Sequence, residues 1–317
     1  MKKMYNNEKI IGRIYQHNLV KKTVQSQTSA NFGKEFISGN IEVAVDEAGL
    51  VIIPVHFTYV TDTTSSGNKN ITYTNLEKII NENNTWIEKG KDGAAKIKID
   101  TALSVNDFYT QDDKLITTKV NEGGFVSFIN GELCPENERN IFTTDMLITQ
   151  ATRVEADPEK NIEKDYLVLK GAVFNFRNEL LPVDFVVKNE DGIRYFEDLN
   201  ISKNEPVLTK VWGKIDCHTI SNEIKEDTAF GEESIRVFER KVKEWIVTGG
   251  AAVPYDIGDE SVITKAEIEK AIQDRNLKIA DIKKRREDYL AQKTSSPTTT
   301  TNTTPTVVNV VTDTFNF

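Results

Sequence analysis

Cysteine and histidine are scarce in this 317-residue chain, and long apolar runs are missing. The two cysteines, Cys134 and Cys217, are too few for a disulfide framework and form no CxxC pair, so a reducing, cytoplasmic setting is expected. The three histidines have no HxxxH or HExxH spacing, which argues against a zinc site. No window approaches the roughly 20 apolar residues that a membrane helix needs. The N-terminus lacks the apolar stretch of a signal peptide.

The sequence signatures of common enzymes are also missing. No phosphate-binding GxxxxGK[ST] loop, GxGxxG turn or GxSxG elbow occurs. Asp107 and the pair Asp112-Asp113 lie in a polar stretch that is typical of a solvated turn. Cys217 and His218 are adjacent, and on a strand they would point to opposite faces. We therefore expect a protein that acts by binding, without catalysis, cofactor or metal.

Charge is distributed unevenly along the chain. The net charge is −9, which is not the overall basic balance that attracts nucleic acid. Residues 1–34 differ from the rest, because they contain seven basic residues and one acidic residue, a net charge of +6. A basic N-terminal arm on an acidic protein is compatible with polyanion binding, and a solvated surface is the alternative.

A short internal repeat indicates two similar halves. Strand-like segments that begin near residues 37 and 169 correspond to each other, so that Gly39 matches Gly171 and Phe57 matches Phe185. Glycine inside a strand is typical of a bulge where a small barrel bends. A proline stands inside both copies, at 54 and 182, and proline in a strand favours an edge or a bulge.

The order of elements in each copy predicts the fold. Alternating segments precede each copy, a helix-like stretch follows (73–80 and 193–199), and alternation then returns (95–99 and 208–215). Three strands, a helix and closing strands are the order of the five-stranded Greek-key OB barrel. Residues 124–129 could supply the fifth strand of the first copy. Another small β-barrel or sandwich is the alternative.

The C-terminal third has a different character. Residues 235–248 favour a strand that pairs back as a hairpin, with a helix as the alternative. Thr264 to Glu267 form a capping box that begins a helix ending near Lys293. Arg275 and Arg286 interrupt its apolar stripe, so we expect the helix to lie on the barrels, with an oligomerisation helix as the alternative. Residues 294–306 contain only Thr, Ser, Pro and Asn, which predicts a disordered linker.

The predicted fold class is therefore mainly β, with two tandem OB-like Greek-key barrels, a C-terminal helix and a disordered tail. The predicted units are a first barrel with its basic arm (1–135), a second barrel (136–220), a β-hairpin or mixed extension (221–263), the helix (264–293) and a linker with a C-terminal tip (294–317).

Aromatic platforms and basic side chains are what single-stranded nucleic acid requires for base stacking and phosphate contact. Strand alternation points Lys96 and Lys98 outward, because Ile97 and Ile99 should face the core. The same rule places Phe174 and Phe176 on an outer face, whereas Phe57 and Phe185 are expected in the core. The candidate nucleic-acid-binding residues are Arg13, Tyr15, Lys21, Lys22, Lys34, Tyr59, Trp86, Lys96, Lys98, Phe108, Tyr109, Phe174, Phe176, Arg177, Lys210, Trp212 and Lys214.

Taken together, these parts resemble the single-stranded DNA-binding proteins of phage and bacterial type. The resemblance is carried by the two [Ile/Leu]-Pro-Val-x-Phe strands, by the glycine strands before them, and by the end Asp313–Phe317 behind a Thr/Pro linker. It implies OB barrels that bind single-stranded DNA without sequence preference, with RNA as the alternative ligand. It also implies work in DNA replication, recombination and repair, in the cytoplasm, or in the host cytoplasm if a phage encodes the chain.

The resemblance further implies a tip that recruits replication or recombination proteins through Asp313, Phe315 and Phe317. A β-prone tail that adds a strand to its own domain is the alternative. The tip departs from the family pattern, because Asp313 is its single acidic side chain where the family tip is usually richer in acid. No membrane partner is expected. A virion or tail structural protein built from tandem β-barrels is the alternative function, and it predicts stable oligomers and no salt-dependent binding of polynucleotides. A homo-oligomer is compatible with either function.

Overall fold

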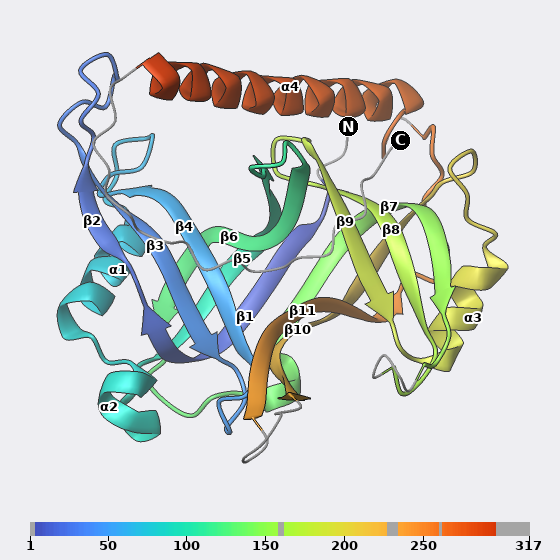
Figure 1. The fold of residues 1–317 in the computed structure, drawn as a ribbon, viewed down its shortest axis with the longest axis horizontal. Coiled ribbons are helices and arrows are strands. Elements are labelled where there is room, and N and C mark those ends of the chain that lie inside the picture. The colour runs from blue at the N-terminus through green and yellow to red at the C-terminus, as the bar shows by residue number, and fades with distance from the viewer. Residues whose placement is uncertain (1–3, 158–161, 227–233, 260–261, 296–317) are drawn as a thin grey trace.

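The first half of the chain folds into a small closed barrel. The computed structural model describes residues 4–157, 162–226, 234–259 and 262–295 (Figure 1). The elements of this half are β1 (Asn6–His17), β2 (Val20–Thr23), β3 (Glu35–Ala44), β4 (Ile52–Thr61), α1 (Ile71–Glu82), α2 (Trp86–Gly93), β5 (Lys96–Tyr109) and β6 (Leu115–Phe128). Strand β1 pairs with β3 and β5, β3 pairs with β4, and β5 pairs with β6, all antiparallel. A parallel pairing of β4 with β6 closes the barrel.

The second half repeats this circuit. After the short helix η1 (Glu136–Glu138), its elements are β7 (Asn140–Val154), β8 (Tyr166–Phe174), β9 (Leu180–Val187), α3 (Glu190–Asp198), β10 (Val207–Glu226) and β11 (Ser234–Gly250). Strand β7 pairs with β8 and β10, β8 with β9, and β10 with β11, all antiparallel. Strand β9 closes the barrel by parallel pairing with β11.

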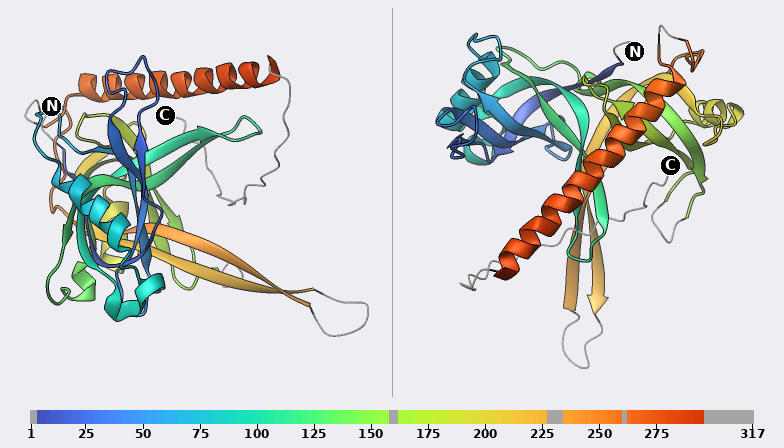
Figure 2. Two further views of the ribbon diagram at one scale, coloured as in Figure 1. Left: turned by 90° about the vertical axis from the view of Figure 1, so that its left-hand side faces the viewer. Right: turned by 90° about the horizontal axis from the view of Figure 1, so that it is seen from above.

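Both circuits have the OB strand order, with helices between the third and fourth barrel strands. The predicted fold class is confirmed for the described residues. The predicted limit of the second barrel at residue 220 is wrong, because its fifth strand, β11, lies in the segment assigned to an extension. The favoured strand over 235–248 is confirmed, since β11 pairs back on β10 as a hairpin. That hairpin projects from the body of the molecule (Figure 2).

The two barrels are joined through their first strands. Residues Asn6–Ile10 of β1 pair antiparallel with Asn140–Thr144 of β7, so that all strands belong to one hydrogen-bonded sheet. The buried apolar side chains of both barrel interiors form one contiguous cluster, in which Phe57 and Phe185 are fully buried as predicted. The described part of the predicted basic N-terminal arm contains β1 and β2, so these residues belong to the wall of the first barrel.

The predicted barrel-bending glycines lie at irregularities of the sheet. A Cβ at Gly39, whose φ is +135°, would lie 2.6 Å from the carbonyl oxygen of Asn18. A Cβ at Gly171 would overlap the carbonyl oxygen of Leu147. Register shifts occur beside both positions, between Ile37 and Gly39 in β3 and between Ile148 and Gln150 in β7. Only glycine permits these close approaches without displacement of the neighbouring strand.

A long helix, α4 (Lys265–Ser295), crosses over both barrels (Figures 1 and 2). The predicted capping box is present, because Thr264 Oγ1 accepts from Glu267 N and the Glu267 carboxylate accepts from Thr264 N. The first turns of α4 pack Ile268 and Ile272 against the outside of the second barrel. The helix therefore lies on the barrels, as expected.

The two arginines of the α4 stripe attach the helix to the first barrel. Arg275 pairs with Asp107 of β5, with N–O distances of 2.5 and 2.6 Å, and both side chains are buried. Arg286 pairs with Asp113 in the β5–β6 turn and donates to the carbonyl oxygen of Gln111. The predicted solvated turn is therefore wrong for Asp107, which lies in a strand beneath α4.

Candidate nucleic-acid interface

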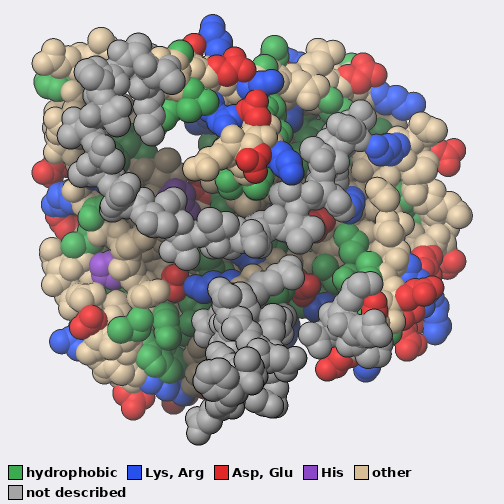
Figure 3. All heavy atoms as spheres, in the orientation of Figure 1, with side chains coloured by type: hydrophobic (Ala, Val, Ile, Leu, Met, Phe, Trp, Pro, Cys, Tyr) green, Lys and Arg blue, Asp and Glu red, His purple; other side chains and the backbone are tan. Residues whose placement is uncertain are grey.

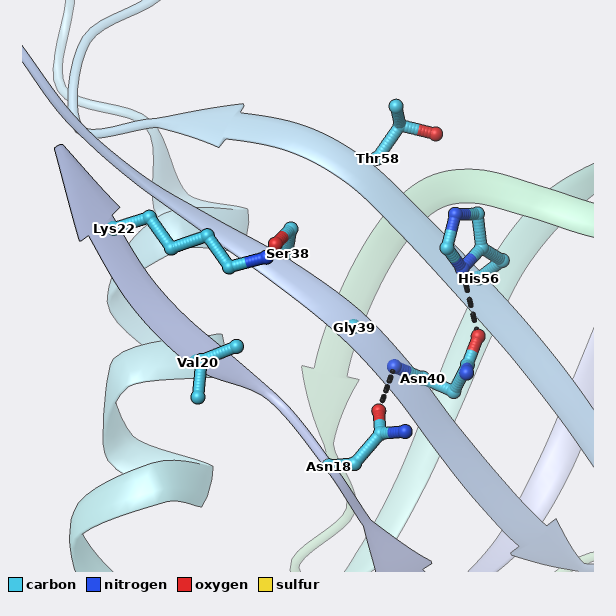
Figure 4. A pocket seen from close by; sticks show the side chains of 8 residues that line it. All are labelled: Asn18, Val20, Lys22, Ser38, Gly39, Asn40, His56 and Thr58. Atoms are coloured by element: carbon cyan, nitrogen blue, oxygen red, sulfur yellow. Dashed lines mark hydrogen bonds between the residues drawn. The ribbon is translucent and has the colours of Figure 1, made fainter. Parts of the chain in front are cut away.

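The first barrel presents an open face on β2, β3 and β4. Directly opposed residues of paired strands point to the same side, and the pairs here are Val20–Ser38, Lys22–Phe36 and Asn40–His56. Figure 3 shows the molecule hollowed on the side that carries these strands, below α4. A hollow of about 420 Å³ is lined by Asn18, Val20, Lys22, Ser38, Gly39, Asn40, His56 and Thr58 (Figure 4). We call this surface the open face, and it includes Phe36 and Tyr59 at its end.

Hydrogen bonds hold the polar groups of the open face in place. The backbone N–H of Asn40 donates to Oδ1 of Asn18 at 2.6 Å. The Asn40 side chain in turn contacts His56, with 2.7 Å between Oδ1 and the ring Nδ1. Lys22 reaches over Ser38 (Figure 4) and makes no ion pair within the described ranges. Its ammonium group is therefore available to an anion from outside.

An aromatic pair borders the hollow. The rings of Phe36 and Tyr59 lie 4.6 Å apart between centroids, and Tyr59 is 42% exposed. Phe36 stands directly opposite Lys22 in the β2–β3 ladder. An exposed ring beside a free ammonium group can stack a base and contact its phosphate at once.

The corresponding face of the second barrel is covered. Ala172, Phe174 and Leu180, on the outside of β8 and β9, are buried against Val262 and Ile263 and the first turns of α4. The prediction that Phe174 is a surface residue is wrong. Alternation placed it correctly on the outer side, opposite to Val173, but the segment before α4 packs on it.

Other predicted residues gather on a different sheet surface. Lys96 and Lys98 of β5 point outward as expected, while Ile97 and Ile99 are fully buried. Lys210, Trp212 and Lys214 of β10 line the outer side of the second barrel, and β1 and β7 lie between β10 and β5. The structure thus brings these five residues onto one surface.

Several predicted cations already have partners. Arg13 lies 3.0 Å from Glu47, whose pKa is lowered to about 2 because Lys91 and Arg139 donate hydrogen bonds to its carboxylate. The ammonium group of Lys21 lies 2.5 Å from Glu77, and this hydrogen bond raises the pKa of the lysine. These two cations are therefore less available to an anionic ligand than Lys22 is.

The remaining predicted residues are dispersed. Tyr15 and Trp86 pack together beside α2, with 6.2 Å between ring centroids. Tyr109 lies under Arg286 of α4, next to the half-exposed Phe108. Phe176 and Arg177 are exposed in the β8–β9 turn. The ammonium group of Lys34 donates a hydrogen bond to Asn31 in the loop before β3. Asp313, Phe315 and Phe317 lie outside the described residues.

Sequence reasoning missed most of the open face. Asn18, Ser38, Asn40, His56 and Thr58 are short polar side chains with no motif of their own. Their signal was the alternation around them, because Ile37, Ile41, Val55 and Phe57 face the core and leave Ser38, Asn40 and His56 on the outside.

Two absences concern only the part of the chain that the structure describes. It contains no group of three His, Cys, Asp or Glu side chains placed to hold a metal ion. None of its helices is both long enough and apolar enough to cross a membrane.

Strand order and surface define a protein with two tandem OB barrels, of which one keeps its strand face open. Comparison of the sequence with protein families places the chain in the YorF family, whose model matches residues 6–285. No curated protein matches the chain. Among solved structures, the chain is similar to a deletion mutant of the single-stranded DNA binding protein from Thermus aquaticus, with 12% identity and a TM-score of 0.46. The match covers 82% of this chain and 100% of that one.

Proposed function

We propose that this protein binds single-stranded DNA without sequence preference and acts by binding rather than by catalysis. The observation that carries the proposal is the open face on β2–β4 of an OB barrel. The second and third strands of OB barrels and the adjoining loops are the surface on which this fold binds oligonucleotides. Here that surface offers a hollow, a free lysine and a half-exposed aromatic pair.

The chemistry of the open face favours an unpaired strand over a duplex. Stacking on Tyr59 needs a base whose face is free, and this requirement selects against paired bases. The hollow beside it is lined by hydroxyl, amide and imidazole groups that can accept or donate without demanding one base. The net charge of −9 opposes long-range attraction of any DNA, so that local contacts decide binding.

The wider role is what the resemblance to single-stranded DNA-binding proteins implies, and it belongs to the same proposal. The protein would protect single-stranded DNA during replication, recombination or repair in the cytoplasm, or in that of a host if a phage encodes it. Asp313, Phe315 and Phe317 would recruit partner proteins. Both parts depend on DNA binding and are tested after it.

The first test is fluorescence anisotropy with a labelled oligo(dT) of about 30 nucleotides, titrated at low and high salt, with a duplex and an oligo(rU) as comparisons. Binding that prefers the single strand and weakens with salt supports the proposal. Equal or tighter binding of oligo(rU) would change the ligand to RNA. No binding at low salt would overturn the proposal, and sizing of the oligomer would then test the virion structural alternative.

The Tyr59→Ala variant tests the open face itself. We expect affinity for oligo(dT) to fall by about 1–3 kcal/mol, because one stacking platform is lost. Leu50→Ala is the matched control, since it truncates an exposed apolar residue in the β3–β4 turn, outside the hollow. Equal affinities of both variants and the unmodified protein would remove Tyr59 from the interface.

A further inference from the structure

We propose a second binding surface for the same single-stranded ligand, on the sheet that joins the two barrels. This inference rests on the proposed function. The surface spans β6, β5, β1, β7 and β10, and we define this joint face by Phe125, Lys98, Lys9, Lys210, Trp212 and Lys214. It lies on a different part of the barrel wall from the open face on β3 and β4.

Strand register assembles the joint face. Lys9 of β1 stands opposite Asp100 of β5 and Ile141 of β7. Beyond them, Asp100 stands opposite Phe125 of β6, and Ile141 stands opposite Lys214 of β10. Opposed residues share a side of the sheet, so one row crosses all five strands, roughly 20 Å from end to end.

Burial shows that this row points outward. Ile10 and Ile99, the chain neighbours of Lys9 and Asp100, are fully buried in the barrel interior. Their neighbours must therefore face away from the core. Phe125, at one end of the row, is 77% exposed.

Trp212 provides the aromatic group at the other end. Its indole is 42% exposed and lies against Gly249, where a Cβ would come within 2.5 Å of Nε1. Lys210 and Lys214 flank it two residues away on the same side of β10. A large exposed ring that packs on a glycine and is flanked by two lysines can serve as a platform for base stacking.

The charge of the joint face indicates a polyanion. Lys9 and Lys214 make no ion pair within the described ranges. The ammonium nitrogen of Lys210 lies 3.6 Å from the centroid of the Tyr5 ring. Lys98 is partly neutralised by Asp100 at 2.8 Å. This excess of lysine stands on a protein of net charge −9.

The same composition argues against a protein partner. Lysine is depleted in the buried centres of protein interfaces, whereas single-stranded nucleic acid uses lysine for phosphates and aromatic rings for bases. Both components are present here, on strands of both barrels. A strand longer than one barrel can cover would therefore contact the open face and the joint face together.

The experiment compares oligo(dT) of about 8 and about 30 nucleotides, because one OB barrel covers roughly 4–16 nucleotides. The first variant is Lys9→Gln/Lys214→Gln, and its control, Lys69→Gln/Lys89→Gln, makes the same change of net charge at exposed positions outside both faces. We expect the first variant to bind the long oligomer roughly tenfold more weakly. Its slope of log affinity against log salt should be smaller by about 1.4, since each phosphate contact on a single strand contributes about 0.7. The short oligomer should bind all variants alike.

A second variant tests the stacking platform. Trp212→Ala should weaken binding of the long oligomer roughly 5- to 150-fold, and Trp212→Phe should restore most of it because a ring remains. Circular dichroism and thermal melting check that each variant is folded. If long and short oligomers bind all joint-face variants as they bind the control, the joint face is overturned while the proposed function stands. If the unmodified protein binds neither oligomer at low salt, both proposals fail.

Discussion

The two barrels have the same strand order, but the face formed by their second and third strands is open on the first barrel and covered on the second. On the first barrel, Ser38, Asn40 and His56 point out from β3 and β4 and line a hollow. On the second barrel, Phe174 and Leu180 point out from β8 and β9 and are buried beneath the segment that leads into α4. Topology alone therefore does not decide which barrel face stays open. The outward side chains decide whether a face is covered, because burial under another segment stabilises apolar side chains and is unfavourable for polar ones.

The hairpins that close the two barrels, unlike these faces, behave alike. Lys119 of β6 reaches across to Asp184 of β9 at 2.6 Å, and Lys241 of β11 reaches Glu42 of β3 at 3.8 Å. Each closing hairpin thus forms an ion pair with the other barrel. Helix α4 is attached to both barrels, but its first turns and the segment before it pack on β8 and β9 of the second barrel. This packing makes the difference between a covered and an open face.

The largest expected effect comes from removal of the covered aromatic. Phe174→Ala should lower the free energy of unfolding by about 3–5 kcal/mol, because a fully buried ring leaves a cavity under α4. Phe176→Ala, two residues along in the exposed turn, should stay within about 0.5 kcal/mol. Urea unfolding measures both, and equal losses would contradict the covered face.

Loosening of the helix should have an effect of similar size or somewhat smaller. Arg275→Ala leaves Asp107 buried without its partner, which typically costs about 3–5 kcal/mol. The double variant Arg275→Met/Asp107→Leu removes both charges and should recover most of that loss. A double variant no more stable than Arg275→Ala would show that the ion pair does not account for the attachment of α4.

The smallest effect concerns the seam between the barrels. Trp245 of β11 donates to Oε1 of Glu8 in β1 at 2.7 Å, and burial raises the pKa of Glu8 to about 7 despite this bond and the nearby Lys243. The folded state therefore holds a proton that the unfolded state releases between about pH 4.5 and 7. The contribution of Glu8 to stability is complete below this window and declines as the pH rises through it.

Glu8→Gln keeps an acceptor for Trp245 and abolishes the titration. Between pH 5 and 7 the unmodified protein should lose on the order of 1–2 kcal/mol of unfolding free energy through this group, and the variant should not. Denaturant titrations at several pH values measure the difference. Parallel pH profiles would mean that Glu8 does not titrate in this range.

Local patterns predicted the barrels well. The repeat around Gly39 and Gly171 located corresponding strands, alternation around Ile97 and Phe57 identified the core, and the Thr264–Glu267 box located the start of α4. These features depend on residues close together in the chain, and the physical rules that govern them are local.

What failed depends on distant packing. Asp107 was assigned to a solvated turn because its partner Arg275 lies 168 residues away. Phe174 was placed on the correct side of β8, but its cover is a later segment that no strand pattern specifies. The open face was missed for a related reason, since Asn40 and His56 come together only when β3 and β4 pair.

The pairing of β1 with β7 sets this molecule apart from two modules on a flexible tether. A tethered pair must be oriented when a ligand engages the second module, and the effective concentration of that module depends on tether length and stiffness. Here backbone hydrogen bonds across the seam have already fixed the separation and direction of the two barrels. Under the proposed function, a ligand held by one barrel would meet the other barrel in a preorganised position, without the entropic cost of orienting a second domain.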